Sequence, residues 1–247
     1  MAGGCSMTTE IIASLRRNVV VGVDGSRPAL GAARWAAREA LRRGGELHLV
    51  FVLPTPIVRP GWSHARAREG LVGAAREDLA DAARAAAEAA PGLGVSRRVR
   101  FGATVPVLAA ESEWAGLLVL GTHGRGRVAA AFRFPVLPAL AAATRAPLVV
   151  LRRDVEPVDR AGAPVLLLTG PTRAAAAARR FAETRGAPLV VADGTRSSRT
   201  DGLAMIVVGA DVRGRRLDGA TGPVVRRLLR TAPCPVAVVR DLPAWAP

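Results

Sequence analysis

The chain has 247 residues and a formal net charge of +15, and all 35 of its basic residues are arginine. Half of the residues are apolar, but aromatic residues make up only 4% and tyrosine is absent. A core built from Ala, Val and Leu favours helices packed on a sheet over an aromatic-rich barrel. The length predicts one or two domains.

The composition argues against several classes of protein. The two cysteines, Cys5 and Cys234, lie far apart and indicate no disulfide framework, which fits the cytoplasm. No apolar run approaches the ~18 residues that a membrane-spanning helix needs. The arginines are spread thinly, and no basic run alternates with the aromatic residues that single-strand nucleic-acid binding usually needs. We therefore expect arginine-rich, solvated helix faces and no nucleic-acid or membrane partner.

The first part of the chain alternates between predicted strands and helices. Residues 18–24 (NVVVGVD) form a continuous apolar run, which is typical of a strand buried on both faces. Pro28 suits a first helical turn and Gly44 a helix end, so they predict a helix over 29–43. The other expected elements are strands over 46–52, 95–101, 116–121 and 147–152, and helices over 65–90, 104–114 and 136–144. This alternation predicts a parallel, doubly wound α/β sheet.

The pattern then restarts, and the two copies match without gaps at an offset of 88 residues. Matched pairs include Gly121 with Gly209, Arg125 with Arg213, Gly126 with Gly214, Pro135 with Pro223, and Pro147 with Pro235. Such a repeat indicates a duplication. The second copy predicts strands over 165–170, 188–193, 204–210 and 235–240, and helices over 172–185 and 223–231. The interval before its strand 204–210 is too short for the strand and two helices that the first copy has there.

We therefore predict two tandem domains. The first spans residues 18–153 and the second, truncated one spans residues 165–241, with a polar linker at 154–164. Residues 1–17 are interpreted as a disordered leader, with either Met1 or Met7 as the start, and residues 242–247 as a tail.

Three features of the sequence resemble the universal stress protein family. They are VVVGVDGS at 19–26, the spacing of Gly121 and Gly124, and TRAPLVVLR at 144–152, which recurs as APCPVAVVR at 232–240. The resemblance implies a five-stranded parallel sheet in the order 3-2-1-4-5, in which the third strand is an edge that the second copy can lose. Domains of this family commonly pair through their last strands. The two halves would then pair within one chain, and a homodimer is a further arrangement that the resemblance allows.

The resemblance also implies a nucleotide site in the first domain. Many relatives bind ATP through a G-2x-G-9x-G-[S/T] loop and an aspartate at the end of the first strand. Asp24 matches this aspartate, and the residues that match the loop region are Gly121, His123, Gly124, Gly126 and Val136. The expected ligand is ATP with Mg²⁺, or AMP, because the adenosine side of the motif survives better than the phosphate side.

The phosphate side departs from the family pattern, since Phe134 and Pro135 replace the final Gly-Ser. Proline has no N–H to donate to a phosphate, and phenylalanine is bulky where the backbone would approach the ligand. Losing one or two charge-assisted hydrogen bonds costs about ten-fold to several thousand-fold in affinity. Arg125, Arg127 and Arg133 could contact phosphate from the side. The sequence is therefore compatible both with a working nucleotide site and with an abandoned one.

We expect a stress-response binding and regulatory module rather than an enzyme, with no catalytic residue and no metal site. The alternative is a ligand-free interaction protein with an abandoned nucleotide pocket. Slow ATP hydrolysis stays open, although no residue is an evident base for water. In the second domain, Thr169 is matched to the aspartate and Pro223 to the serine, so we interpret this domain as a structural partner. Trp35 and Trp114 are interpreted as packing residues.

Overall fold

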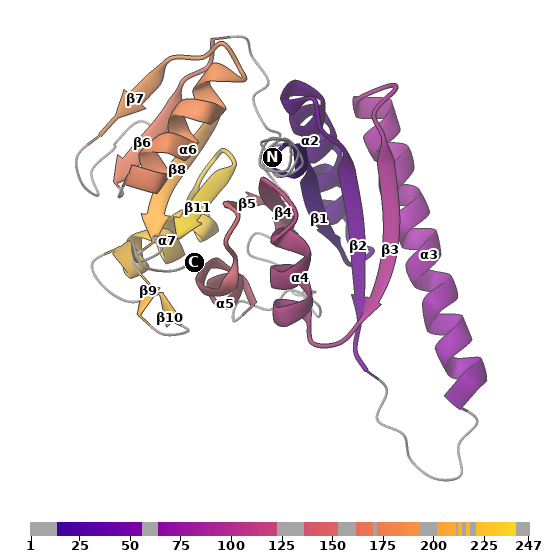
Figure 1. Cartoon of the computed structure of the whole chain (residues 1–247). Coiled ribbons are helices and arrows are strands. Elements are labelled where there is room, and N and C mark those ends of the chain that lie inside the picture. The colour runs from indigo at the N-terminus through magenta and orange to yellow at the C-terminus, as the bar shows by residue number, and fades with distance from the viewer. Residues whose placement is uncertain are drawn as a thin grey trace, which may run out of the picture.

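The computed structural model describes residues 14–55, 64–122, 136–152, 162–169, 172–192, 202–210, 212–213, 216–217 and 221–240. The strands of the first half are β1 (Val19–Val23), β2 (Leu47–Leu53), β3 (Val95–Phe101), β4 (Leu117–Thr122) and β5 (Leu148–Arg152). Those of the second half are β6 (Val165–Thr169), β7 (Leu189–Val191), β8 (Met205–Ala210) and β11 (Val236–Arg240). Together they form one nine-stranded sheet in the order β3-β2-β1-β4-β5-β11-β8-β6-β7 (Figure 1).

The strand order confirms the fold that the resemblance implied. The first half is parallel in the order 3-2-1-4-5. The second half is parallel in the order β7-β6-β8-β11, which corresponds to 2-1-4-5 in the first half, and β7 is its edge. Loss of an edge strand removes no pairing between the strands that remain, which explains how the truncated half keeps a continuous sheet.

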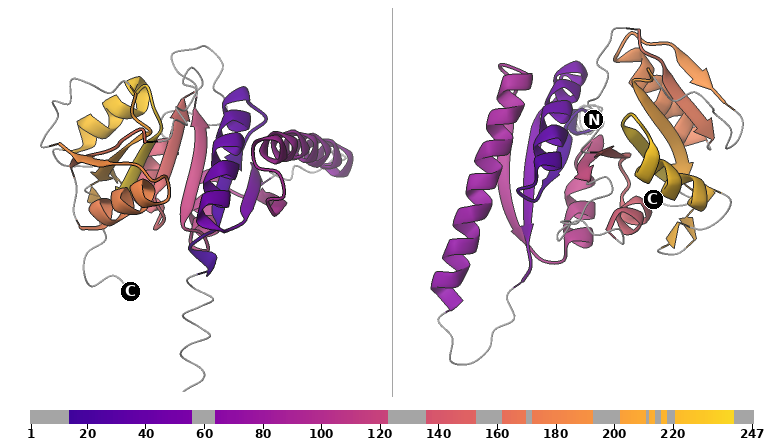
Figure 2. Two further views of the ribbon diagram at one scale, coloured as in Figure 1. Left: turned by 90° about the horizontal axis from the view of Figure 1, so that it is seen from above. Right: turned by 180° about the vertical axis from the view of Figure 1, so that it is seen from behind.

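Helices cover both faces of the sheet (Figure 2). On one face lie α2 (Arg27–Arg43), α3 (His64–Ala89) and α6 (Thr172–Glu183). On the other lie α4 (Thr104–Ser112), α5 (Val136–Ala143) and α7 (Thr221–Thr231). Successive strand residues point to opposite faces, so the strands contribute side chains to two apolar clusters, one on each face. Each cluster contains residues of both halves. The continuous apolar runs in the sequence follow from this burial on both sides.

The two halves join through their last strands, as the resemblance implied. β5 and β11 pair antiparallel, whereas the other neighbouring strands of this sheet are parallel. The paired residues are Val149 with Ala237, Leu148 with Val238, and Val150 with Val236. Because corresponding residues of the two copies are 88 apart, exchanging the halves maps the central pair, Val149 with Ala237, onto itself and the two flanking pairs onto each other. The seam is therefore an internal version of a two-fold symmetric interface.

Two details of the second half differ from the sequence prediction. A short hairpin of β9 (Val212–Arg213) and β10 (Arg216–Leu217) follows β8, where no strands were expected. The register of β6 against β8 shifts between Leu167 and Thr169, so that Thr169 pairs with Val208. The counterpart of Val208 in the first half pairs with Gly22. Thr169 therefore lies within its strand, and matching it to Asp24 was wrong.

The two tryptophans interpreted as packing residues have opposite environments. Trp35 on α2 is 5% exposed and lies in the core, which confirms the prediction. Trp114 is 65% exposed, so its prediction was wrong. It lies beyond the end of α4, where the helix no longer covers the sheet. Within the described ranges, no helix combines the length and apolar character that crossing a bilayer requires.

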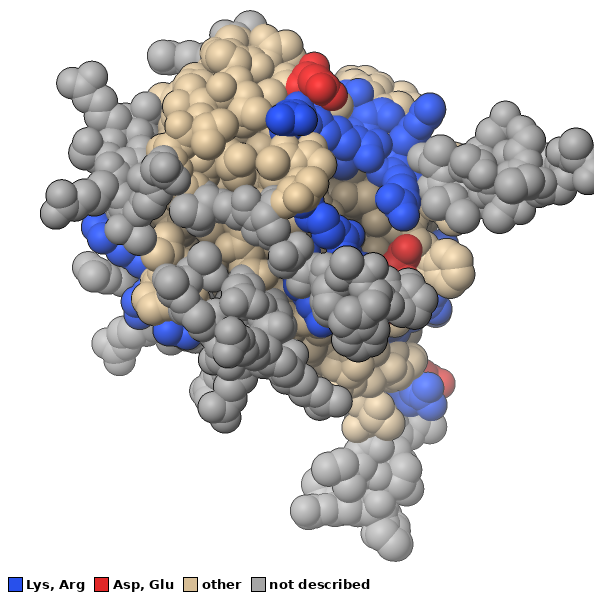
Figure 3. All heavy atoms as spheres, turned by 60° about the vertical axis from the view of Figure 1, so that its left-hand side comes forward, with Lys and Arg blue, Asp and Glu red and all other residues tan. Residues whose placement is uncertain are grey.

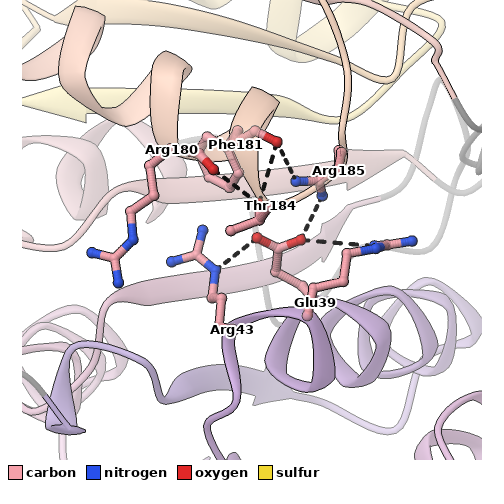
Figure 4. Close-up of polar contacts among 7 residues, drawn as sticks. Glu39, Arg43, Arg180, Phe181, Thr184 and Arg185 are labelled. Atoms are coloured by element: carbon pink, nitrogen blue, oxygen red, sulfur yellow. Dashed lines mark hydrogen bonds and ion pairs between the residues drawn. The ribbon is translucent and has the colours of Figure 1, made fainter.

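A buried ion cluster also connects the two halves, between α2 and the end of α6 (Figure 4). Glu39 on α2 accepts hydrogen bonds from Arg43 Nε at 2.7 Å and from Arg185 Nη2 at 2.6 Å. The guanidiniums of both arginines lie over the ring of Phe181, 4.9 and 5.4 Å from its centroid. Burial by itself raises the pKa of Glu39, but Arg185 and Arg43 more than offset this, and the pKa is lowered.

Replacing Glu39 by Gln is expected to destabilise the protein by about 3–5 kcal/mol at pH 7, because two largely buried guanidiniums lose their counter-charge. Urea unfolding measures this loss. A lowered carboxyl pKa stabilises the fold above the unfolded-state pKa, and this contribution disappears as the pH falls through the folded-state pKa. The difference between wild type and Glu39→Gln should therefore shrink in acid.

The matched control is Glu88→Gln. Glu88 forms an exposed ion pair with Arg34 at 3.5 Å, and exposed pairs contribute about 0–1 kcal/mol. Equal stability of the Glu39 and Glu88 variants at pH 7 would contradict a role for the buried cluster in joining the halves.

Candidate functional site

The described part of the candidate site lies at the carboxyl ends of β1 and β4. These neighbouring strands lead to helices on opposite faces, since α2 follows β1 and α5 follows β4. The strand order reverses at this point, and ligands of open parallel sheets bind in the crevice that such a reversal leaves. The fold thus places Asp24 and Gly121 at the end of the sheet where a ligand is expected.

Asp24 shapes the turn between β1 and α2. Its Oδ1 accepts hydrogen bonds from the backbone N of Ser26 at 3.1 Å and from Ser26 Oγ at 2.5 Å. Ser26 is the N-cap of α2, and its Oγ also accepts from Ala29 N at 3.4 Å. Gly25 between them has a φ of 74°, which glycine adopts without strain. Among the described residues, Oδ2 of Asp24 has no hydrogen-bond partner, so this oxygen can accept from a ligand hydroxyl.

A small cavity adjoins Asp24 between β1, β2 and the start of α4. Its volume is about 60 Å³, and it is lined by Gly22, Val23, Asp24, Val50, Phe51, Val52, Thr104 and Leu108. Ligand pockets usually measure ~300–1,000 Å³, so these residues form one wall of a nucleotide site rather than all of it. Sequence reasoning missed the residues on β2 and α4, because their apolar side chains are indistinguishable from those of an ordinary core.

Gly121 has a packing role at the same place. A Cβ at this position would lie 2.7 Å from Ala29 N and closer still to the carbonyl of Pro28. A side chain cannot fit there without moving the first turn of α2. Asp24 and Gly121 therefore meet at the N-terminus of α2, and the need for glycine at 121 arises from helix packing.

The other predicted loop residues are separated from this arrangement. Val136 is the first residue of α5 and packs against the apolar cluster on that face of the sheet. His123, Gly124 and Gly126 lie outside the described residues, as do Phe134 and Pro135. The predicted contacts with phosphate therefore stay predictions. Within the described ranges, no group of three or more His, Cys, Asp or Glu residues could hold a metal ion.

A second carboxylate makes this end of the sheet acidic. Asp78 on α3 approaches the β1–α2 turn so closely that a Cβ on Gly25 would lie 2.8 Å from its Oδ1. Burial raises the pKa of Asp78 first, and the negative charges of Asp81 and Asp24 raise it further. Two carboxylates repel a phosphate, so the wall beside Asp24 suits the uncharged nucleoside part of a ligand.

The packing role of Gly121 predicts that Gly121→Ala destabilises the protein by about 1–3 kcal/mol, as overpacked sites do. The matched control is Gly31→Ala on α2, where an added Cβ meets no atom within 4 Å. That substitution should stabilise the helix by about 0.5–1 kcal/mol. Urea unfolding without ligand measures both changes, and an unaltered stability of Gly121→Ala would show that the glycine is not needed for packing.

Comparison with curated proteins points to one family. The Universal stress protein family model matches residues 15–152. A universal stress protein of Mycobacterium bovis is 34% identical over 192 residues, which cover 70% of this chain and 61% of that protein. Another from Mycobacterium tuberculosis is 35% identical over 139 residues, which cover 55% of this chain and 48% of that protein. The chain thus spans about half to three fifths of the length of these relatives.

Solved structures show the same fold. A universal stress protein from Archaeoglobus fulgidus aligns with 91% of this chain and 98% of its own, with a TM-score of 0.72 and 14% identity. A universal stress protein in complex with cAMP covers 54% of this chain, with a TM-score of 0.42 and 22% identity, and the cAMP is a ligand of that protein. The family model alone matches more than half of the chain. The chain belongs to the universal stress protein family.

Proposed function

We propose that this protein is a cytoplasmic binding and regulatory module that takes an adenine nucleotide at the carboxyl end of β1, without catalysing a reaction. The observation that carries the proposal is the carboxylate of Asp24. It lies beside an apolar cavity at the reversal of strand order, and one of its oxygens has no partner among the described residues.

The residues on this wall fit the adenosine part of such a ligand. Oδ2 of Asp24 would accept a hydrogen bond from a ribose hydroxyl. Val52 supplies a partly exposed apolar side chain for the base, with the buried side chains of Val50 and Leu108 behind it, and Thr104 adds a hydroxyl. The negative charge of Asp24 and Asp78 would keep phosphates away from this wall and direct them toward the residues that follow β4. AMP and ATP would make the same contacts with this wall, because they differ only in their phosphates.

A ligand here could affect the second half through α2. The N-terminus of α2 carries the turn that Asp24 and Ser26 form. Its C-terminal turns carry Glu39 and Arg43, which contact the end of α6 through Arg185. Helix α2 therefore connects the turn beside the proposed nucleotide to the contact between the halves. Binding that favours one position of α2 would bias that contact, which is the form that a regulatory response takes.

A ligand-free interaction protein is the second candidate. Loss of the strand beyond β7 leaves Val190 44% exposed and Val191 69% exposed on an edge strand. Exposed apolar edges are sites where other chains can pair. This function requires no nucleotide, so ligand binding separates the two candidates.

Thermal unfolding with ATP, ADP, AMP and cAMP, each with Mg²⁺, tests the proposal. At 100 times its dissociation constant, a ligand stabilises the protein by about 2.7 kcal/mol, which raises the Tm measurably. The shift should be lost in Asp24→Asn. That variant keeps an oxygen to accept from Ser26 but replaces Oδ2 with an amide that donates instead of accepting.

Asp81→Asn on α3 is the control, because it removes the same charge from an exposed side chain that pairs with Arg84. It should keep the ligand-induced shift. If wild type shows no shift with any of the four nucleotides, the proposed function is wrong and the interaction protein is the better account.

A further inference from the structure

A second and larger cavity lies at the opposite, amino end of the strands. Its volume is about 640 Å³, within the ~300–1,000 Å³ range of small-molecule pockets. Its walls include Gly116 just before β4, Pro147 just before β5, and Ala177 on α6. The cavity therefore lies where the two halves meet and is formed by both of them.

Arginine dominates the lining of this cavity. Its charged residues are Arg16, Arg43, Arg145, Arg173 and Arg180, against the single carboxylate of Glu113. We call this site the arginine cavity. Figure 3 shows a dense group of arginine side chains on this side of the molecule, with few acidic ones among them. The fold thus brings arginines that are far apart in the sequence together at this cavity.

The guanidiniums of the arginine cavity are close enough to repel one another. Burial lowers the pKa of Arg180, and the positive charges of Arg43, Arg16 and Arg17 lower it further. In Figure 4 the guanidinium of Arg43 lies between Glu39 and Arg180. Glu39 holds Arg43 in place through its Nε, which leaves the terminal nitrogens of Arg43 on the side of Arg180. One arginine of the cavity is therefore fixed in position before any ligand arrives, which reduces the entropy lost on binding.

The arginines of the cavity are not explained simply as the solvent-exposed face of α6. A solvated helix face explains Arg173 and Arg180, but it does not explain why Arg16 and Arg145 of the first half line the same hollow. The exposed ring of Trp114 also borders the cavity, and a large exposed aromatic side chain next to arginines suits a ligand with a flat ring. A chain of phosphates presents several anionic groups that a set of guanidiniums can bind together.

We propose that the arginine cavity binds the phosphate chain of a small molecule, such as a di- or triphosphate. The ligand would contact residues of both halves and relieve the repulsion between their arginines. The proposal is independent of nucleotide binding at Asp24, because the two sites lie at opposite ends of the sheet and share no residue.

Isothermal titration of the full chain with inorganic tripolyphosphate tests the proposal. The variant is Arg173→Gln/Arg180→Gln, which removes two exposed arginines of the cavity and leaves the Glu39 cluster intact. The charge-matched control is Arg179→Gln/Arg227→Gln, which changes two exposed arginines on α6 and α7 that do not line the cavity. We expect tripolyphosphate to bind wild type and the control equally, and the variant at least about ten-fold more weakly.

Two results would overturn the proposal. One is the absence of tripolyphosphate binding to wild type. The other is an equal loss of affinity in the variant and the control, which would mean that net charge alone attracts the anion.

Comparing tripolyphosphate with ATP in an Asp24→Asn background identifies the source of the phosphates. A nucleotide would stack its base on Trp114 and change the tryptophan fluorescence more than tripolyphosphate does. Equal fluorescence changes would indicate that the phosphate chain alone is recognised. Either result supports binding in the arginine cavity, provided that the fluorescence change is lost in Arg173→Gln/Arg180→Gln. If tripolyphosphate does not bind here, nucleotide binding at Asp24 is unaffected, because thermal unfolding with AMP measures that site separately.

Discussion

The antiparallel pairing of β5 and β11 is the contact on which the rest of this structure depends. It joins two parallel sheets into one, and its symmetric register brings α2 beside α6 on a single face. This arrangement lets the buried carboxylate of Glu39 accept a hydrogen bond from Arg185 of the other half. The arginine cavity also lies where the two halves meet. A sheet of the first half alone would leave its last strand as an unpaired edge, which is a site of aggregation. The truncated half therefore has a structural reason to be retained.

Helix α2 carries opposite electrostatics at its two ends. Its N-terminus lies beside the carboxylates of Asp24 and Asp78, and its C-terminal turn supplies Arg43 to the arginine cavity. An uncharged nucleoside and a phosphate chain are suited to opposite ends of the same sheet. This separation of charge gives the two proposed sites different ligand preferences, and α2 connects both of them to the contact between the halves.

Much of the fold could be predicted from the sequence. Because the strands are buried on both faces, they have continuous apolar runs, which identify them in the sequence. The 88-residue offset is reproduced by the bounds of β4 and β8 and by those of β5 and β11. The features that sequence reasoning missed depend on three-dimensional proximity. The cavity walls on β2 and α4 have the apolar residues of an ordinary core. The register shift near Thr169 has no signal in residue type. The arginines of the arginine cavity lie far apart in the sequence, from Arg16 to Arg180. Of the predicted site, Asp24 and Gly121 meet at one helix terminus, and Val136 packs elsewhere.

Hydrogen–deuterium exchange of the full chain with and without AMP tests the central claim, that adenine nucleotide binds at the carboxyl end of β1. Bound AMP should slow exchange at the backbone amides of the β1–α2 turn around Gly25 and Ser26, and in the first turn of α4 from Thr104. Unchanged exchange at both places under saturating AMP, or protection confined to residues of the arginine cavity, would contradict this claim.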